Sequence, residues 1–108
     1  IACDIDGVIC SSTTENYQEA KPDFEAINKI NALYKEGHEI ILFSARYMGR
    51  TNGNVEKAYK IGYKFTFSQL KKWGVNFHTL ILGKPSYDLL VDDKAYNYDD
   101  SWKKKIKI

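Results

Sequence analysis

The feature that most constrains the fold of this chain is the alternation of short apolar runs with longer amphipathic stretches. Apolar runs of strand length occupy residues 1–6, 39–43, 79–82 and 89–91. Amphipathic stretches with apolar residues near helical spacing occupy residues 22–37 and 66–74. Strands that alternate with helices are typical of an open sheet with parallel neighbours. The sequence therefore predicts an α/β fold with one open, mainly parallel sheet and flanking helices.

Local signals place the ends of the two predicted helices. Pro22 and Asp23 precede the first amphipathic stretch, and Gly37 follows it in the position of a C-terminal cap. For the second stretch, Thr66 is the expected N-terminal cap and Gly74 the residue that ends the helix. We therefore expect the order strand, helix, strand, helix, strand, strand.

Size and charge limit the class of protein. The chain has 108 residues, enough for one domain and too few for a second unit with its own core. Hydrophobic residues make up 44% and charged residues 28%, which are ordinary values for a globular protein. The net charge of +2 is too small to indicate nucleic acid or an anionic membrane as a partner. The lysines between positions 103 and 107 are expected to form a solvated tail.

The sequence gives no sign of a membrane segment or of secretion. No apolar run has the length needed to span a bilayer, and no signal-peptide pattern opens the chain. Cys3 and Cys10 have neither the spacing of a zinc site nor that of a disulfide framework. We therefore expect a protein of the reduced cytoplasm with no membrane partner.

Polar side chains stand where the predicted strands end. They are carboxylates, one hydroxyl and one amine: Asp4, Asp6, Ser44, Lys84, Asp92 and Asp93. In open α/β sheets, ligands bind in the crevice outside the carboxyl ends of the strands. Carboxylate oxygens suit Mg²⁺, and a hydroxyl with an amine suits a phosphoryl group. Each residue alone has an ordinary interpretation as a turn, a cap or a solvated side chain, so the shared position carries the prediction of a metal and phosphate site.

These residues stand in the order of a known signature. The segment Asp4-Ile5-Asp6-Gly7-Val8, followed by Ser44, Lys84 and Asp92-Asp93, resembles the four motifs of the haloacid dehalogenase-like (HAD-like) phosphatases. This resemblance covers nearly the whole chain. A second set is similar to small phosphatases associated with capsule polysaccharide biosynthesis in bacteria: Ser44-Ala45-Arg46-Tyr47-Met48, Gly53-Asn54, Trp73 and Gly83-Lys84-Pro85.

The resemblance implies a catalytic role for each motif residue. Asp4 would be the nucleophile, and Asp6 would be the general acid and base. Ser44 and Lys84 would hold the phosphoryl group. The implied reaction is the hydrolysis of a phosphomonoester through an aspartyl-phosphate intermediate.

The resemblance also implies magnesium as the cofactor. Its ligands would be Asp4, the main-chain carbonyl of Asp6, and Asp92. Asp93 would contact the metal through water or orient a neighbouring group. The physical chemistry agrees, because a carboxylate can attack a phosphate dianion once a cation and a lysine neutralise its charge.

The positions at which HAD-like proteins insert a cap domain are short in this chain. Between Gly7 and Pro22, residues 8–21 suffice for a flap, and only Gly83 separates the third strand from Lys84. The resemblance therefore implies a Rossmann-like core without a cap over residues 1–108, with an open site.

An open site implies either a macromolecular substrate or a small one that a neighbouring subunit covers. We expect a small sugar, polyol or amino-alcohol phosphate of capsule or surface-polysaccharide biosynthesis, and a homo-oligomer. The loop after the second strand holds candidates for binding the leaving group, namely Arg46, Tyr47, Arg50 and Asn54, of which Arg46 and Asn54 are the residues we assign. For Arg46 a surface ion pair is the alternative.

Other functions remain open at this stage. One is a nucleic-acid or protein phosphatase of the same superfamily, although the near-neutral charge counts against nucleic acid. Another is a non-catalytic, receiver-like module that binds Mg²⁺ and phosphate. A receiver carries its acceptor aspartate on a later strand, whereas here Asp4 and Asp6 end the first. Binding alone would also not require a proton shuttle at Asp6.

Overall fold

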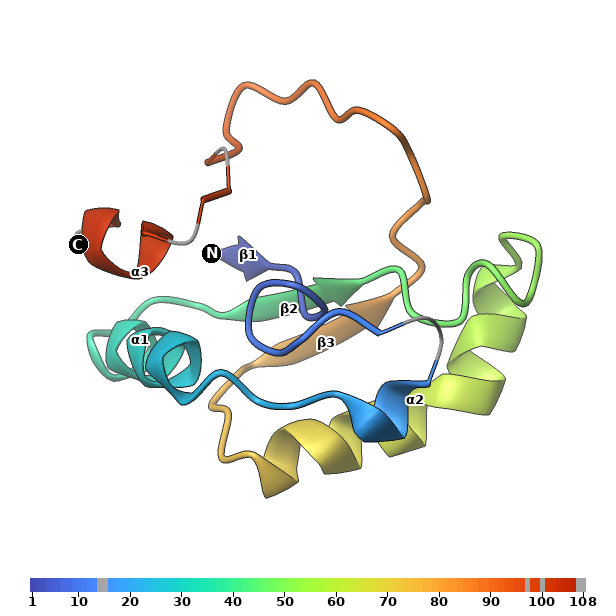
Figure 1. Ribbon diagram of the computed structural model, residues 1–108, viewed down its shortest axis with the longest axis horizontal. Helices are drawn as coiled ribbons and strands as arrows, with labels where there is room; N and C mark the ends of the chain where they lie inside the picture. The colour runs from blue at the N-terminus through green and yellow to red at the C-terminus, as the bar shows by residue number, and fades with distance from the viewer. Residues whose placement is uncertain (14–15, 97, 100, 107–108) are drawn as a thin grey trace.

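The computed structural model describes residues 1–13, 16–96, 98–99 and 101–106. Its elements are, in chain order (Figure 1), β1 Ala2–Cys3, the 3-10 helix η1 Tyr17–Glu19, α1 Phe24–Lys35, β2 Ile41–Ser44, α2 Val55–Lys72, β3 Thr79–Leu82 and α3 Trp102–Lys105. The predicted alternation of strands and helices is confirmed from β1 to β3.

In the described part of the chain, the strands form one parallel sheet in the order β1-β2-β3. Cys3 pairs with Leu42, and Leu42 pairs in turn with Leu80. α1 connects β1 to β2 and α2 connects β2 to β3, which are the helical crossovers that parallel strands need. Because all three strands point the same way, their carboxyl ends lie at one edge of the sheet. The predicted α/β class with a parallel sheet and flanking helices is confirmed.

α1 lies where the sequence predicts it. The side chain of Asp23 accepts a hydrogen bond from the backbone N–H of Ala26 (3.1 Å) and caps the first turn. Gly37 follows the helix with a φ of 101°, a left-handed conformation that glycine adopts without strain. One face of the helix is buried through Ile27 and Ile30, as the apolar spacing requires.

The predicted start of α2 at Thr66 is wrong. The helix begins at Val55, and its N-terminal cap is Asn54, whose side chain accepts a hydrogen bond from the N–H of Lys57 (3.0 Å). Thr66 is buried within the helix instead. The apolar pattern misses the first half because the buried face there consists of small residues, Ala58 and Gly62, which give little hydrophobic periodicity.

The hydrophobic core lies between the sheet and the helices. Its members come from every strand or its flanks, from α1 and α2, and from the C-terminal segment. The large side chains among them are Ile5, Ile9, Ile27, Ile30, Leu33, Ile40, Leu42, Leu70, Val75, Leu80, Leu82 and Trp102. The core therefore fixes β1 and β3, the two strands that deliver carboxylates and lysine to the sheet edge.

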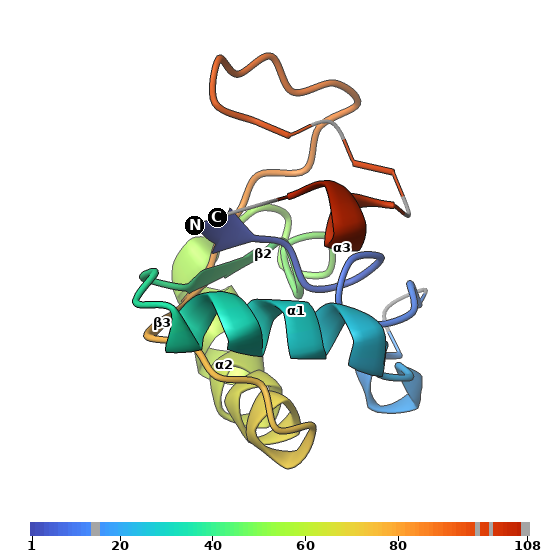
Figure 2. The same cartoon turned by 90° about the vertical axis from the view of Figure 1, so that its left-hand side faces the viewer.

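The fourth predicted strand, residues 89–91, is also wrong. This segment is not a strand, and Leu89 and Val91 are 80% and 89% exposed. It belongs to a long connection between β3 and α3 that arches out beyond β1 (Figure 1 and Figure 2). An apolar run becomes a strand only when it hydrogen-bonds to a neighbour, and β1 offers an edge of just two residues, Ala2–Cys3.

Among the described C-terminal lysines, Lys104 and Lys105 are exposed as expected, whereas Lys103 is not. Trp102 is 4% exposed and packs into the core, which anchors α3 against α1. Lys103 forms an ion pair with Asp23 (3.0 Å), the residue that caps α1. Lys107 lies outside the described residues. No described helix is long and apolar enough to cross a membrane.

Candidate active site

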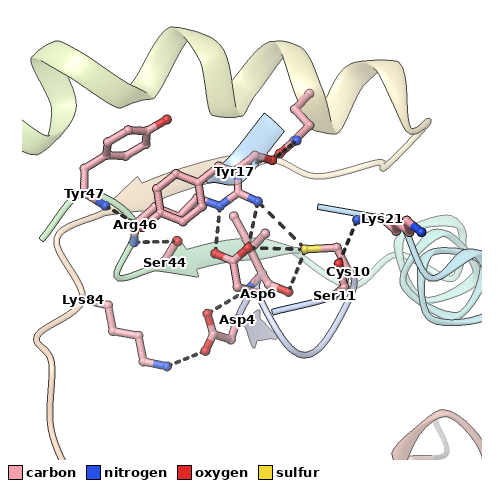
Figure 3. A network of polar contacts seen from close by, with 12 residues as sticks. Asp4, Asp6, Cys10, Ser11, Tyr17, Lys21, Ser44, Arg46, Tyr47 and Lys84 are labelled. Carbon is pink, nitrogen blue, oxygen red and sulfur yellow. Dashed lines mark hydrogen bonds and ion pairs between the residues drawn. The ribbon is translucent and has the colours of Figure 1, made fainter. Parts of the chain in front are cut away.

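Two carboxylates and a lysine meet at the carboxyl edge of the sheet (Figure 3). Asp4 directly follows β1, Ser44 is the last residue of β2, and Lys84 stands two residues beyond β3. The ammonium Nζ of Lys84 lies 3.1 Å from Oδ2 of Asp4. The parallel order of the strands thus brings together residues that are 80 positions apart in the sequence.

The Asp4 carboxylate is held at both oxygens but remains accessible. Its Oδ1 accepts a hydrogen bond from the N–H of Ile5 (2.7 Å), and its Oδ2 accepts one from Lys84. The side chain of Asp4 is 36% exposed. Burial lowers the pKa of Lys84, but hydrogen bonds to Tyr87 and Asp4 outweigh that effect and hold this pKa above its ordinary value. Lys84 is therefore an ammonium ion beside an accessible carboxylate.

Asp6 lies against the buried guanidinium of Arg46. Nε of Arg46 donates to Oδ2 of Asp6 (2.8 Å), and Nη2 donates to Oδ1 (2.9 Å). The Arg46 side chain is 0% exposed, whereas that of Asp6 keeps 22% of its surface open. Burial lowers the pKa of Arg46, but the hydrogen bonds and charge of Asp6 outweigh it and raise this pKa. The pair is a bidentate, charge-assisted contact at the rim of the site.

Arg46 has further partners that no sequence pattern indicated. Its Nη1 donates to Oε1 of Gln69 (2.7 Å), and Nε2 of Gln69 donates to the carbonyl oxygen of Tyr17 (2.7 Å). The Tyr17 ring lies 4.6 Å from the guanidinium carbon. The one signal for Gln69 is its spacing, since it falls on the same buried face of α2 as Ala58. The alternative role of Arg46 in a surface ion pair is wrong, because the guanidinium that pairs with Asp6 is 0% exposed.

Ser44 is buried rather than open to a ligand. It is 1% exposed, and its Oγ accepts a hydrogen bond from the backbone N–H of Arg46 (3.0 Å). In the structure, this serine shapes the turn that directs Arg46 toward Asp6. Its predicted contact with a phosphoryl group stays a prediction.

The two cysteines border the carboxylates as neutral thiols. The Sγ of Cys10 lies 3.5 Å from Oδ1 of Asp6. Burial, and after it the charge of Asp6, raises the pKa of the Cys10 thiol to about 12. Burial and the charge of Asp4 likewise raise the pKa of Cys3 to about 12. Neither thiol is therefore an activated nucleophile.

The structure does not bring Asp92 and Asp93 to the carboxylate edge. Both are exposed in the long connection after β3, and Oδ1 of Asp92 accepts a hydrogen bond from the N–H of Lys94 (2.8 Å). This differs from the expected metal ligand at a strand end, because the predicted strand 89–91 is absent. Asn54 is likewise occupied as the cap of α2 and makes no described contact with Asp4 or Asp6.

The residues at the edge can take a magnesium ion only together with other oxygen ligands. Among residues 1–13, 16–96, 98–99 and 101–106, no group of three or more His, Cys, Asp or Glu side chains gathers in metal-binding geometry. Mg²⁺ is often held by one or two carboxylates completed by waters and substrate phosphate. The accessible carboxylate of Asp4 fits this looser mode, whereas the Asp6 carboxylate is already paired with Arg46.

One cavity borders Asp4, and a second lies near the flap without Asp4 or Asp6 in its lining. One, of about 530 Å³, is bordered by Asp4, Lys84 and Tyr87, and its far wall is the C-terminal segment with Trp102. A second, of about 490 Å³, lies between Gly7 and the base of the 8–21 flap. Volumes of this size accommodate small-molecule ligands.

The fold and site together define a small α/β protein whose sheet edge presents two carboxylates and a lysine. No protein-family model matches the chain, and no curated protein matches it. It is similar to a crystal structure of a structural-genomics target from Vibrio cholerae, with a TM-score of 0.88 and 25% sequence identity. The match covers 100% of this chain and 89% of the other. The description of that protein states no activity, so the likeness bears on the fold.

Proposed function

We propose that this protein is a magnesium-dependent phosphomonoester hydrolase that acts through an aspartyl-phosphate on Asp4. The observation that carries the proposal is the contact between Asp4 and Lys84, 3.1 Å apart at the carboxyl edge with Asp6 two residues away. A carboxylate that is both accessible and paired with an ammonium ion suits attack on a dianionic phosphate. The HAD-like order of these residues agrees with the same chemistry.

Each residue has a defined task in the proposed reaction. An oxygen of Asp4 attacks phosphorus, the bond from phosphorus to the leaving oxygen breaks, and Asp6 protonates that oxygen. Water, deprotonated by Asp6, then attacks the phosphorus of the aspartyl-phosphate, which releases phosphate and restores Asp4. Lys84 neutralises charge on the phosphoryl oxygens throughout.

Magnesium supplies electrostatic stabilisation of the phosphoryl charge when it is bound. Asp4 and the main-chain carbonyl of Asp6 are the proposed ligands from the carboxylate edge. Asp92 stays a predicted third ligand, and it would have to approach from the exposed connection. Asp92→Asn tests this point, since a raised magnesium requirement supports the assignment and an unchanged one refutes it.

The proposed substrate is a small phosphomonoester, such as a sugar, polyol or amino-alcohol phosphate of surface-polysaccharide biosynthesis. The cavity of about 530 Å³ that Asp4 and Lys84 border supports a small ligand rather than a polymer. Only Gly83 lies between β3 and Lys84, so the chain itself adds no cap there, and a second copy is the proposed cover.

The experiment measures phosphate release from a panel of small phosphomonoesters with magnesium and after chelation. Asp4→Asn is expected to abolish turnover, whereas Asp88→Asn, which neutralises an exposed carboxylate four residues after Lys84 in the sequence, serves as the matched control. A phosphate adduct trapped in wild-type protein should map to Asp4 by mass spectrometry. Turnover that survives chelation or Asp4→Asn would refute the proposal. Phosphate binding without turnover would favour a non-catalytic module.

A further inference from the structure

The guanidinium of Arg46 is fully engaged by the protein. Each of its three nitrogens donates to a partner: Nε and Nη2 to the two oxygens of Asp6, and Nη1 to Gln69. The side chain is 0% exposed. Contact with a leaving group would require Arg46 to break these bonds in a buried environment, which is costly. Arg46 is therefore poorly placed to bind the leaving group of a substrate.

We propose that Arg46 is a positioning residue that fixes the carboxylate of Asp6 for proton transfer. This inference rests on the proposed function. A planar guanidinium binding both oxygens prevents rotation of the carboxylate about its last bond. The 22% of the Asp6 side chain that remains exposed then faces solvent in one orientation. Proton transfer depends on such alignment, because the carboxylate must lie within hydrogen-bond reach of the leaving oxygen.

The orientation of Arg46 is itself fixed by residues from two other elements. Gln69 on α2 accepts from Arg46 with its oxygen and donates to the Tyr17 carbonyl with its nitrogen, both at 2.7 Å, so its amide has one allowed orientation. The Tyr17 ring on η1 covers the guanidinium face at 4.6 Å. Asp6 is thus aligned by a chain of contacts that runs through the loops after β1 and β2, through α2 and through η1.

A positioning role makes a prediction that a purely structural role does not. Proton donation matters most for a poor leaving group, so Arg46→Lys should slow an alkyl ester more than an activated aryl ester. General acid–base catalysis is typically worth about 10²–10⁴-fold, so partial misalignment should lower kcat for glycerol phosphate by roughly 10–100-fold while KM stays near its wild-type value. Because Asp6 also serves the hydrolysis of the aspartyl-phosphate that both esters form, the two esters are compared by kcat/KM, whose loss for para-nitrophenyl phosphate should be clearly smaller.

Two further variants separate alignment from stability. Gln69→Leu leaves the pair of Arg46 and Asp6 intact but removes its anchor, so it should show the same substrate dependence with a smaller loss. Ile27→Ala truncates an apolar core side chain on α1 that takes no part in these hydrogen bonds, and it should lower the melting temperature without substrate dependence. Added guanidinium should restore part of the alkyl-ester activity to Arg46→Ala but not to Ile27→Ala.

The outcomes distinguish this inference from the proposed function. A wild-type protein that releases no phosphate refutes the proposed function. An active wild type with equal losses of kcat/KM on both esters in Arg46→Lys and Gln69→Leu overturns the positioning role, because kcat/KM reports the phosphorylation step and not the hydrolysis of the shared aspartyl-phosphate. A raised KM with unchanged kcat also overturns it, because Arg46 would then bind substrate. If Arg46→Lys does not fold, Gln69→Leu decides by the same comparison.

Discussion

Removing the charge of Asp6 should lower the free energy of unfolding of the protein, in addition to any effect on the proposed catalysis. Asp6→Asn leaves Arg46, whose side chain is 0% exposed, without a counter-ion and turns an amide N–H toward its donors. Breaking a buried ion pair on one side typically costs about 3–5 kcal/mol. Gln69 still binds the guanidinium and Asp6 is partly exposed, so we expect the lower end, about 3 kcal/mol. The melting temperature should fall by roughly 10–20 °C.

A double-mutant cycle isolates the contribution of the pair. Urea unfolding, followed by circular dichroism, is measured for wild type, Asp6→Asn, Arg46→Met and the double variant. The double variant should be more stable than the sum of the single losses predicts, because it buries no unpaired charge. If Asp6→Asn lowers the free energy of unfolding by less than about 1 kcal/mol, and the coupling energy of Asp6 and Arg46 is below about 0.5 kcal/mol, the pair does not stabilise the fold as argued.

Three further predictions concern the surroundings of the site. Asp23→Ala removes the cap of α1 and the partner of Lys103, so the free energy of unfolding at neutral pH should fall by about 1 kcal/mol. Burial raises the pKa of Asp23, but bonds from Ala26 and Lys103 outweigh it and lower this pKa, so the contribution is lost as pH falls and acid urea titrations of both proteins should converge. Cys10, with a pKa of about 12, should react with iodoacetamide at pH ~8 far more slowly in the native than in the urea-unfolded protein, as mass spectrometry can follow. Gly62→Ala places a methyl group into the buried Tyr47 ring and should cost about 1–3 kcal/mol in thermal unfolding.

Each of these three predictions can be refuted by a specific measurement. A constant stability difference between wild type and Asp23→Ala down to acid pH would contradict the assigned pKa shift. Equal alkylation rates of Cys10 in native and unfolded protein would contradict its burial. A Gly62→Ala protein as stable as wild type would contradict the close packing of α2 on the loop after β2.

The sequence was sufficient where local signals and chain topology decide the structure. α1 carries both a capping Asp23 and a terminating Gly37, and β2 and β3 are apolar runs of strand length. Once the strands are parallel, their carboxyl ends must share an edge. The meeting of Asp4 and Lys84 follows from that rule, without any knowledge of side-chain contacts.

The sequence was insufficient where contacts between residues far apart in the chain determine the structure. Residues 89–91 have the apolar character of β3, but strand formation depends on an edge to pair with, which composition does not reveal. The start of α2 was missed because small residues fill its buried face. The partner of Arg46 was also hidden, since a guanidinium after a strand fits a surface pair, a phosphate contact or a buried pair equally well. Only the fold brings Asp6, 40 residues away, to it.

The residues that meet at the carboxylate edge are far apart in the sequence, and this separation determines when the site forms during folding. Asp4 is synthesised 80 residues before its partner Lys84, which depends on β3 for its position. Closing loops of this length is entropically unfavourable until packing of the core offsets the lost entropy. Such contacts therefore form late in folding. A nascent or truncated chain therefore carries the proposed nucleophile without its lysine. Activity of this protein would report on folding of the chain from β1 through β3, not on any fragment of it.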